Sequence, residues 1–217
     1  MLYRRLTTRR YLDLPALIAW LSSRQYAPEG GFSGRTNKLV DGCYSHWVGG
    51  CWPLIEAALD RQAPLSDASR QAPEPLYSRE GLIRYILCCC QASQGGLRDK
   101  PETYVLLPRP ENGIRATVAD SFNRRPDAYH SCYVLAGLSS AQYSNHYHQP
   151  AAPFPAPSTL PAYLWTKPTL AHASAGPEEK AAIFNHDDCV GEVHPIFVIP
   201  WKLAESTRTF FESKVGL

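Results

Sequence analysis

The sequence lacks several features that would assign a protein to a common class. No apolar run reaches the roughly 18–20 residues that a membrane span needs, and the formal net charge is only +2 over 217 residues. A chain this close to neutral is not a general binder of polyanions, so we expect no nucleic-acid partner. The seven cysteines contain no CxxC pair and do not have the spacing of a small disulfide framework. We therefore expect reduced thiols in a cytoplasmic protein without membrane insertion.

The sequence also has little of the apolar–polar alternation that marks half-buried strands. Apolar residues recur instead at helical spacing in five segments, which are 14–21, 44–59, 82–89, 129–143 and 201–211. Pro53 lies inside the second segment and should bend that helix, because its ring removes the hydrogen bond back to Gly49. The fold class that this pattern predicts is all-α.

Two stretches of the sequence resemble each other. Residues 29–47 (EGGFSGRTNKLVDGCYSHW) and 94–133 each contain a glycine pair, an apolar residue, a nearby basic residue and an aspartate that opens a helix. The second stretch is longer, which predicts a loop insertion within 102–126. Six prolines between 149 and 168 predict another insertion within 149–180. Repeated helical hairpins predict a solenoid or a closed ring of helix pairs, here within a single domain over 1–217.

Asp41, Cys43 and His130 are candidates for a metal site. Superimposing the two repeats places Asp41 on Asp127 and Cys43 on Tyr129, so that His130 arrives beside the first pair. A carboxylate, a thiolate and an imidazole suit zinc, and three protein ligands leave the open position of a catalytic site. Each residue also has a structural explanation, because an aspartate at a helix start is usually an N-cap and a single cysteine or histidine usually packs. Spacing alone leaves both explanations open.

Four motifs carry a resemblance to a known family. GGFSGRTNKLVDGCYSHW, GGLRDKP, DAYHSCYVLAGLS and HPIFVIP resemble the C-terminal half of the protein farnesyltransferase β-subunit family. The resemblance is close over 25–143, looser over 192–212, and absent from the two insertions. It implies α–α hairpins of an (α/α)6 barrel, of which the chain would hold only the C-terminal half. It also implies a helical α subunit as the partner in a heterodimer.

The resemblance further implies an activity, which is transfer of farnesyl from farnesyl diphosphate to the cysteine thiolate of C-terminal CaaX sequences. Asp41, Cys43 and His130 would bind one zinc ion, with the substrate thiolate as the fourth ligand. The other implied site residues are Arg35, Lys38 and Tyr44 for the diphosphate, Asp99 for magnesium, and Trp47, Tyr129 and Tyr133 for the isoprenoid and the peptide. Without the resemblance, these residues would be interpreted as a basic turn, a turn aspartate and core aromatics.

Three other functions remain open at this point. Geranylgeranyltransferases resemble the same family, but the type I enzymes tend to have lysine where this chain has Asp99, which favours farnesyl. A truncated, non-catalytic helical-repeat binding module is the second alternative. A zinc hydrolase with water in the open position is the third, although no general base is evident beside the ligands.

Overall fold

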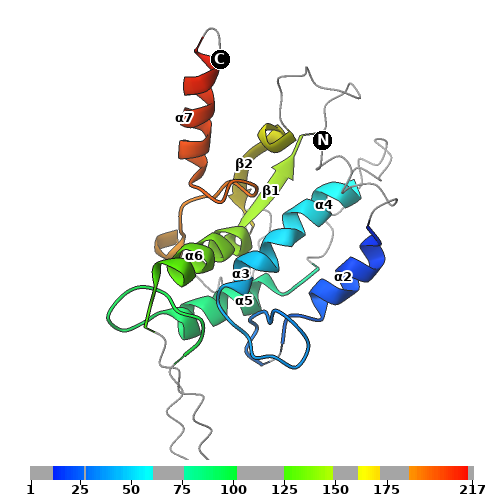
Figure 1. The fold of residues 1–217 in the computed structure, drawn as a ribbon, viewed down its shortest axis with the longest axis vertical. Coiled ribbons are helices and arrows are strands. Elements are labelled where there is room, and N and C mark those ends of the chain that lie inside the picture. The colour runs from blue at the N-terminus through cyan, green and yellow to red at the C-terminus, as the bar shows by residue number, and fades with distance from the viewer. Residues whose placement is uncertain are drawn as a thin grey trace, which may run out of the picture.

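The computed structural model describes residues 12–26, 28–60, 76–101, 125–148, 161–171 and 186–214. Six α-helices are the main elements of this part, and Figure 1 shows them with two short strands. The helices are α2 (Leu14–Ser22), α3 (Tyr44–Trp47), α4 (Trp52–Asp60), α5 (Arg79–Tyr85), α6 (Ala128–Gln142) and α7 (Trp201–Glu212). The shorter elements are the 3-10 turns η1 (Gly49–Cys51), η3 (Pro161–Leu164) and η4 (His186–Asp188), the π-helix η2 (Ile86–Cys90), and the strands β1 (Tyr143–Tyr147) and β2 (Trp165–Leu170).

Polar side chains define where three of the helices begin. Asp13 accepts a hydrogen bond from the backbone N–H of Ala16 and so caps α2. Ser78 caps α5 through Gly81, and Asp127 caps α6 through His130. Each cap satisfies a backbone donor that the first helical turn leaves without a partner.

Pro53 interrupts the apolar segment 44–59, as its sequence predicts. The helix α3 ends at Trp47, the 3-10 turn η1 follows, and α4 begins one residue before the proline. A proline in the first turn of a helix removes an N–H that has no intrahelical acceptor in any case. The predicted bend is therefore a full break between two helices.

The main core lies between α3, α4, α5, η2 and α6. Its fully buried side chains include Phe32, Trp52, Tyr85 and Val134, and Tyr77 stacks on Trp52 with ring centroids 5.6 Å apart. Large aromatic side chains contribute most of the apolar area that such a core removes from water. The start of α3 and the start of α6 are thus held against one buried cluster.

A two-stranded antiparallel sheet departs from the all-α prediction. Tyr143 was expected to continue the helix of 129–143, but α6 ends at Gln142 and Tyr143 begins β1, opposite Leu170 of β2. The register shifts between Ser144 and His146, opposite the stretch that contains Pro168. A proline cannot donate to a ladder and is tolerated at such an irregularity. The sheet is a local addition, and the predicted helical architecture otherwise holds.

The two predicted insertions lie largely outside the described residues. Residues 102–124 belong to the first, while 149–160 and 172–180 belong to the second. Within the second, η3 and β2 are ordered elements rather than a plain loop. The extent of a single domain over 1–217 stays a prediction. In the described ranges, no helix is both long and apolar enough to cross a bilayer.

Candidate metal centre

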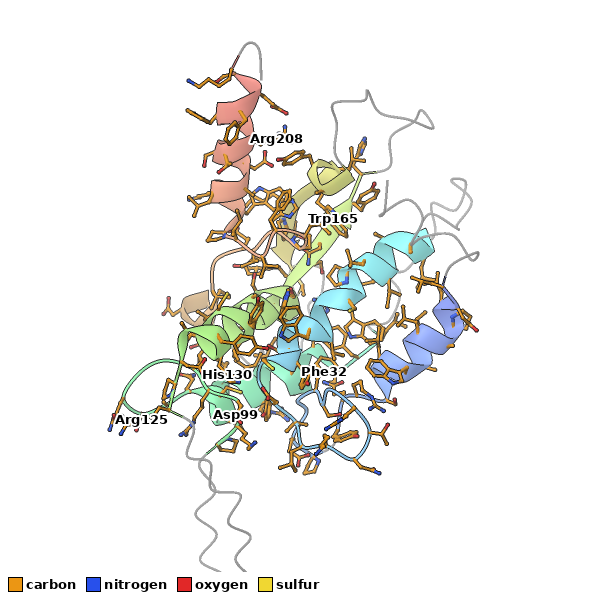
Figure 2. The ribbon with its side chains drawn as sticks, viewed as in Figure 1. Phe32, Asp99, Arg125, His130, Trp165 and Arg208 are labelled. Atoms are coloured by element: carbon orange, nitrogen blue, oxygen red, sulfur yellow. The ribbon has the colours of Figure 1, made fainter. Side chains whose placement is uncertain are left out.

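The structure brings Asp41, Cys43 and His130 together. Each side chain offers one ligand atom, and these atoms all lie within 4.8 Å of one another. The Nε2 atom of His130 is 3.7 Å from Oδ1 of Asp41. Bond lengths of about 2.0–2.3 Å to a tetrahedral zinc ion separate its ligand atoms by about 3.3–3.8 Å. Figure 2 shows His130 close to Asp99 in the lower part of the molecule, far from Trp165 and Arg208.

A tight turn positions Asp41 and Cys43. The carboxylate Oδ1 of Asp41 accepts the backbone N–H of Cys43 at 2.9 Å, and Asp41 N–H donates to the carbonyl of Phe32 at 3.0 Å. Gly42 lies between them and donates its N–H to the carbonyl of Asp99. A Cβ atom on Gly42 would lie only 2.8 Å from Val134. The turn therefore needs glycine. The N-cap of α3 is Cys43, so Asp41 stabilises the turn before the helix rather than capping it.

His130, the third candidate ligand, lies near the other two because α3 and α6 pack very closely. Gly137 of α6 faces Ser45 of α3, and a Cβ atom at Gly137 would lie 2.0 Å from Ser45 Oγ. The hydroxyl of Ser45 donates to the carbonyl of Tyr133 at 3.4 Å. Small residues at a helix contact allow the two backbones to approach. This approach is what places His130 beside the turn of Asp41.

Asp127 is a site residue that the sequence-based prediction missed. Its Oδ1 accepts the backbone N–H of His130 at 2.7 Å, and its Oδ2 lies 2.8 Å from the ring Nδ1. These bonds lower the pKa of Asp127, first through the backbone N–H and then through the ring. A carboxylate on Nδ1 keeps the proton there and leaves Nε2 as the metal-binding atom. The spacing of three between Asp127 and His130 was the available signal, but it was interpreted only as a helix start.

The donor set fits zinc. Burial raises the pKa of the Cys43 thiol to about 12, and the hydrogen bond and charge of Asp41 act in the same direction, while Tyr129 opposes them. A thiol in this environment keeps its proton until a cation replaces it. One sulfur, one imidazole and one carboxylate around a single point are ligands that zinc accepts.

Basic side chains line a hollow of about 900 Å³ next to Asp41. Arg35, Lys38, Tyr44 and Lys100 all contribute to its wall. Arg35 and Lys38 are exposed, so their charges face the space rather than the core. Two carboxylates, Glu29 and Asp41, lie in the same wall, but three cations and a phenol outnumber them and suit an anionic group. Lys100 was not among the predicted site residues, although it follows Asp99 directly.

Asp99 is held differently from the prediction. Its side chain is only 5% exposed, with Oδ2 3.0 Å from Lys100 Nζ and Oδ1 accepting the Lys100 backbone N–H. The carbonyl of Asp99 accepts hydrogen bonds from Gly42 and from the hydroxyl of Tyr85. Both carboxylate oxygens thus have a partner within residues 99–100. The role of Asp99 as a magnesium ligand stays a prediction.

The predicted aromatic residues form one cluster. Tyr133 lies 4.5 Å from Trp47 and 4.9 Å from Tyr129 between ring centroids, and His46 stacks on Tyr133 at 5.2 Å. Burial lowers the pKa of His46, so its ring is neutral near pH 7. Trp47 and Tyr129 are nearly half exposed, at 46% and 48%. The cluster is therefore an accessible apolar surface beside the metal ligands rather than part of the core.

A match over most of the chain identifies the class of protein. Residues 2–199 match the family model described as the prenyltransferase alpha-alpha toroid domain. The chain belongs to this prenyltransferase toroid family. The helical-repeat fold predicted from the sequence is thereby confirmed.

Individual relatives narrow the comparison within the family. The chain is 50% identical over 212 residues to the protein farnesyltransferase subunit beta of Pyricularia oryzae, covering 97% of this chain and 34% of the relative. It is 34% identical over 199 residues to the same subunit of Schizosaccharomyces pombe, covering 91% of this chain and 39% of the relative. The type-2 geranylgeranyl transferase subunit beta of Saccharomyces cerevisiae is 32% identical to the chain over 126 residues, which cover 58% of this chain and 27% of the relative. The chain thus spans about a third of the length of the curated relatives it matches.

Proposed function

We propose that this chain carries the zinc-binding part of a protein farnesyltransferase β subunit. The observation that carries the proposal is the convergence of Asp41, Cys43 and His130, within 4.8 Å, between a basic hollow and an aromatic surface. The 50% identity to a farnesyltransferase subunit beta supports the same reaction. All seven cysteines are free thiols, which is consistent with a reducing cytoplasm.

Asp41, Cys43 and His130 would hold one zinc ion. When bound, zinc would stabilise the thiolate of a substrate cysteine near neutral pH. Asp127 keeps the proton on Nδ1 of His130, so Nε2 faces the ion. Backbone hydrogen bonds from Asp41 to Phe32 and from Gly42 to Asp99 would fix the turn before any ion arrives, because they do not depend on the metal.

Arg35, Lys38, Tyr44 and Lys100 would bind the diphosphate in the hollow. In the transfer, the sulfur of the acceptor cysteine forms a bond to C1 of farnesyl diphosphate while the bond between C1 and oxygen breaks. The departing diphosphate takes the electron pair and becomes more negative. Fixed cations and a phenolic donor stabilise this charge as it develops. Lys38 and Tyr44 are the closest in sequence to the metal ligands and are assigned to the reacting phosphate.

Trp47, Tyr129 and Tyr133 would cover the isoprenoid and the apolar residues of the CaaX peptide. Their rings provide an apolar wall that starts at the metal ligands, so the chain of the substrate can run along it away from C1. The chain is 50% and 34% identical to the farnesyltransferase subunits of Pyricularia oryzae and Schizosaccharomyces pombe, against 32% for the type-2 geranylgeranyl transferase subunit, which favours farnesyl as the group transferred. A heterodimer with an α subunit is part of this proposal.

A non-catalytic binding module is the second candidate. The chain spans only about a third of its relatives' length. If it acts by itself, it would lack any part of a substrate pocket that the other two thirds of such a relative form. A chain of this kind would keep the metal ligands and the fold without turnover. Metal content and activity together separate the two functions.

The test is zinc per folded chain by native mass spectrometry, on the wild type and on His130→Ala. We expect about one zinc, lost in the variant. The matched control is His146→Ala, which removes an exposed histidine of β1 that bonds Thr169 instead. No zinc in the wild type, or equal zinc in His130→Ala, would contradict the site. Transfer by the chain mixed with an α subunit, measured with farnesyl and geranylgeranyl diphosphate, then distinguishes an enzyme from a binding module.

A further inference from the structure

Arg24, the second residue after α2, is a buried cation that no described carboxylate pairs with. It is 4% exposed, and its Nη2 atom donates to the hydroxyls of Ser23 at 3.0 Å and Thr36 at 3.1 Å. Its Nε and Nη1 atoms are buried without a hydrogen-bond partner. None of the ion pairs between described residues includes Arg24. The guanidinium lies over the ring of Trp20, 4.9 Å from its centroid. Within the described part of the chain, its side chain thus contacts only neutral groups.

A charge in this position is unfavourable for the fold alone. Burial disfavours the charged form of a side chain, yet arginine does not lose its proton in a protein. Buried guanidinium groups are therefore usually paired with a carboxylate or a bound anion. The carbonyl groups at the end of α2 carry partial negative charge and offset only part of the cost. An anion that binds nearby would supply the rest.

Arg24 lies directly behind one wall of the basic hollow. The backbone N–H of Ser33 donates to the Arg24 carbonyl at 2.8 Å, which joins the end of α2 to the turn that follows Ser33. Thr36, which accepts from the guanidinium, stands in this turn between Arg35 and Asn37, and both of these line the hollow. Figure 1 shows the segment as the blue loop between α2 and α3. The buried charge is thus separated from the hollow by a single turn of the backbone.

We propose that Arg24 is a positioning residue of the anion site, which supports the turn at Thr36 and attracts the diphosphate in the hollow through its buried charge. The inference rests on the function proposed above, in which this hollow binds diphosphate. A charge surrounded by protein is screened less than one in water, so its field acts over a longer distance. The exposed Arg35 and Lys38 contact the anion, whereas Arg24 adds attraction without touching it.

The test is binding of inorganic diphosphate to the full chain, measured by calorimetry in a buffer with a chelator so that no metal contributes. Arg24→Met removes the charge and keeps a long buried side chain, so we expect the affinity to fall about tenfold. Arg24→Lys keeps the charge and should restore most of the affinity. The matched control is Arg208→Met, which removes the same charge from α7, where Arg208 pairs with Glu205 and Glu212. Figure 2 shows Arg208 far from Asp99 and the site, so this variant should bind like the wild type.

Stability separates this role from a purely structural one. An apolar side chain in place of an unpaired buried charge removes the cost of burying that charge. Thr36 is exposed, so its hydroxyl can bond to water once the guanidinium is gone. Urea unfolding of Arg24→Met should therefore require as much free energy as unfolding of the wild type, or more. Weaker diphosphate binding together with lower stability in Arg24→Met would overturn the proposal.

Arg35→Met tests the hollow itself, because Arg35 lines it and is exposed. We expect this variant to bind diphosphate more weakly than the wild type. If it does so while Arg24→Met binds like the wild type, the role of Arg24 is wrong and the hollow remains the diphosphate site. If the wild-type chain does not bind diphosphate at all, the assignment of the hollow is wrong, and the role of Arg24 is wrong with it.

Discussion

The ring of His130 lies between two carboxylates, with Nδ1 2.8 Å from Oδ2 of Asp127 and Nε2 3.7 Å from Oδ1 of Asp41. The first carboxylate is three residues earlier on the same chain segment, whereas the second comes from the other repeat. One therefore orients the ring locally, and the other would share the proposed metal ion with it. The two roles predict different effects of substitution.

Asp127→Asn should weaken zinc binding by about 10–100-fold, the usual effect of losing a carboxylate behind a metal-binding histidine. Asparagine caps a helix as well as aspartate, so the loss would not come from an unfolded α6. Zinc affinity measured by competition with a chelator gives the comparison, with unfolding in urea as a check on stability. Equal affinity in the variant and the wild type would show that Asp127 acts only as a cap.

Gly137→Ala should destabilise the fold by about 1–3 kcal/mol, because the added methyl group meets Ser45 at 2.0 Å and must push α3 and α6 apart. Zinc affinity should fall with it, since His130 moves with α6. Urea unfolding and chelator competition measure the two effects. Gly191→Ala is the control, as a Cβ atom at Gly191 has nothing within 4 Å.

Zinc binding should strengthen by about tenfold per pH unit between pH 7 and 9, because one proton must leave for each ion bound. Burial raises the pKa of Cys43 to about 12, so the thiol is protonated throughout this range. Calorimetry in two buffers of different ionisation enthalpy counts the released proton. In Cys43→Ser the affinity should drop and the slope should flatten. A steep slope that survives this change would assign the proton to another group.

Stability should fall as the pH drops below about 6.5, the pKa of histidine in an unfolded chain. Burial lowers the pKa of His194 in the fold, and its Nδ1 accepts the backbone N–H groups of Ile196 and Phe197. The neutral ring is thus the folded form. The stabilisation that His194 provides is complete above the pKa that histidine has in the unfolded chain. It is lost as the pH decreases toward the lower pKa of His194 in the folded protein.

The measurement is the free energy of urea unfolding at pH 5 and pH 7.5. His194→Phe keeps the stacking on Trp201 and should reduce the difference between the two pH values. Part of the difference in unfolding free energy should persist in this variant, because burial also lowers the pKa of His46. His146→Gln, at an exposed position, should leave the difference unchanged. The same difference in His194→Phe as in the wild type would exclude His194 as the cause.

Periodicity in the sequence was sufficient to predict most of the helices. The spacing of Leu14, Leu17, Ile18 and Leu21 corresponds to α2, and the segment 201–211 corresponds to α7. The sheet was missed because β1 pairs with a strand that begins 18 residues after β1 ends. Such a long-range partner leaves no local signal, and the intervening prolines indicated a loop.

The candidate site was predicted in part. The repeat and the resemblance indicated Asp41, Cys43 and His130, which the structure brings together. The pairing of Asp99 with Lys100 and the bond from Trp47 to Tyr129 were not predicted. Both depend on side-chain directions set by tertiary packing, and residue types along a chain do not specify those directions.

A hydrogen bond joins the residues on either side of the first predicted insertion. Leu97 donates its N–H to the hydroxyl of Ser131 at 3.1 Å, across the whole stretch between them. Gly42 is anchored on the carbonyl of Asp99, and His130 is anchored on Asp127. The candidate ligands are thus positioned by residues on either side of 102–124. We therefore expect a change in the number of residues between 101 and 125 to leave the candidate metal centre in place.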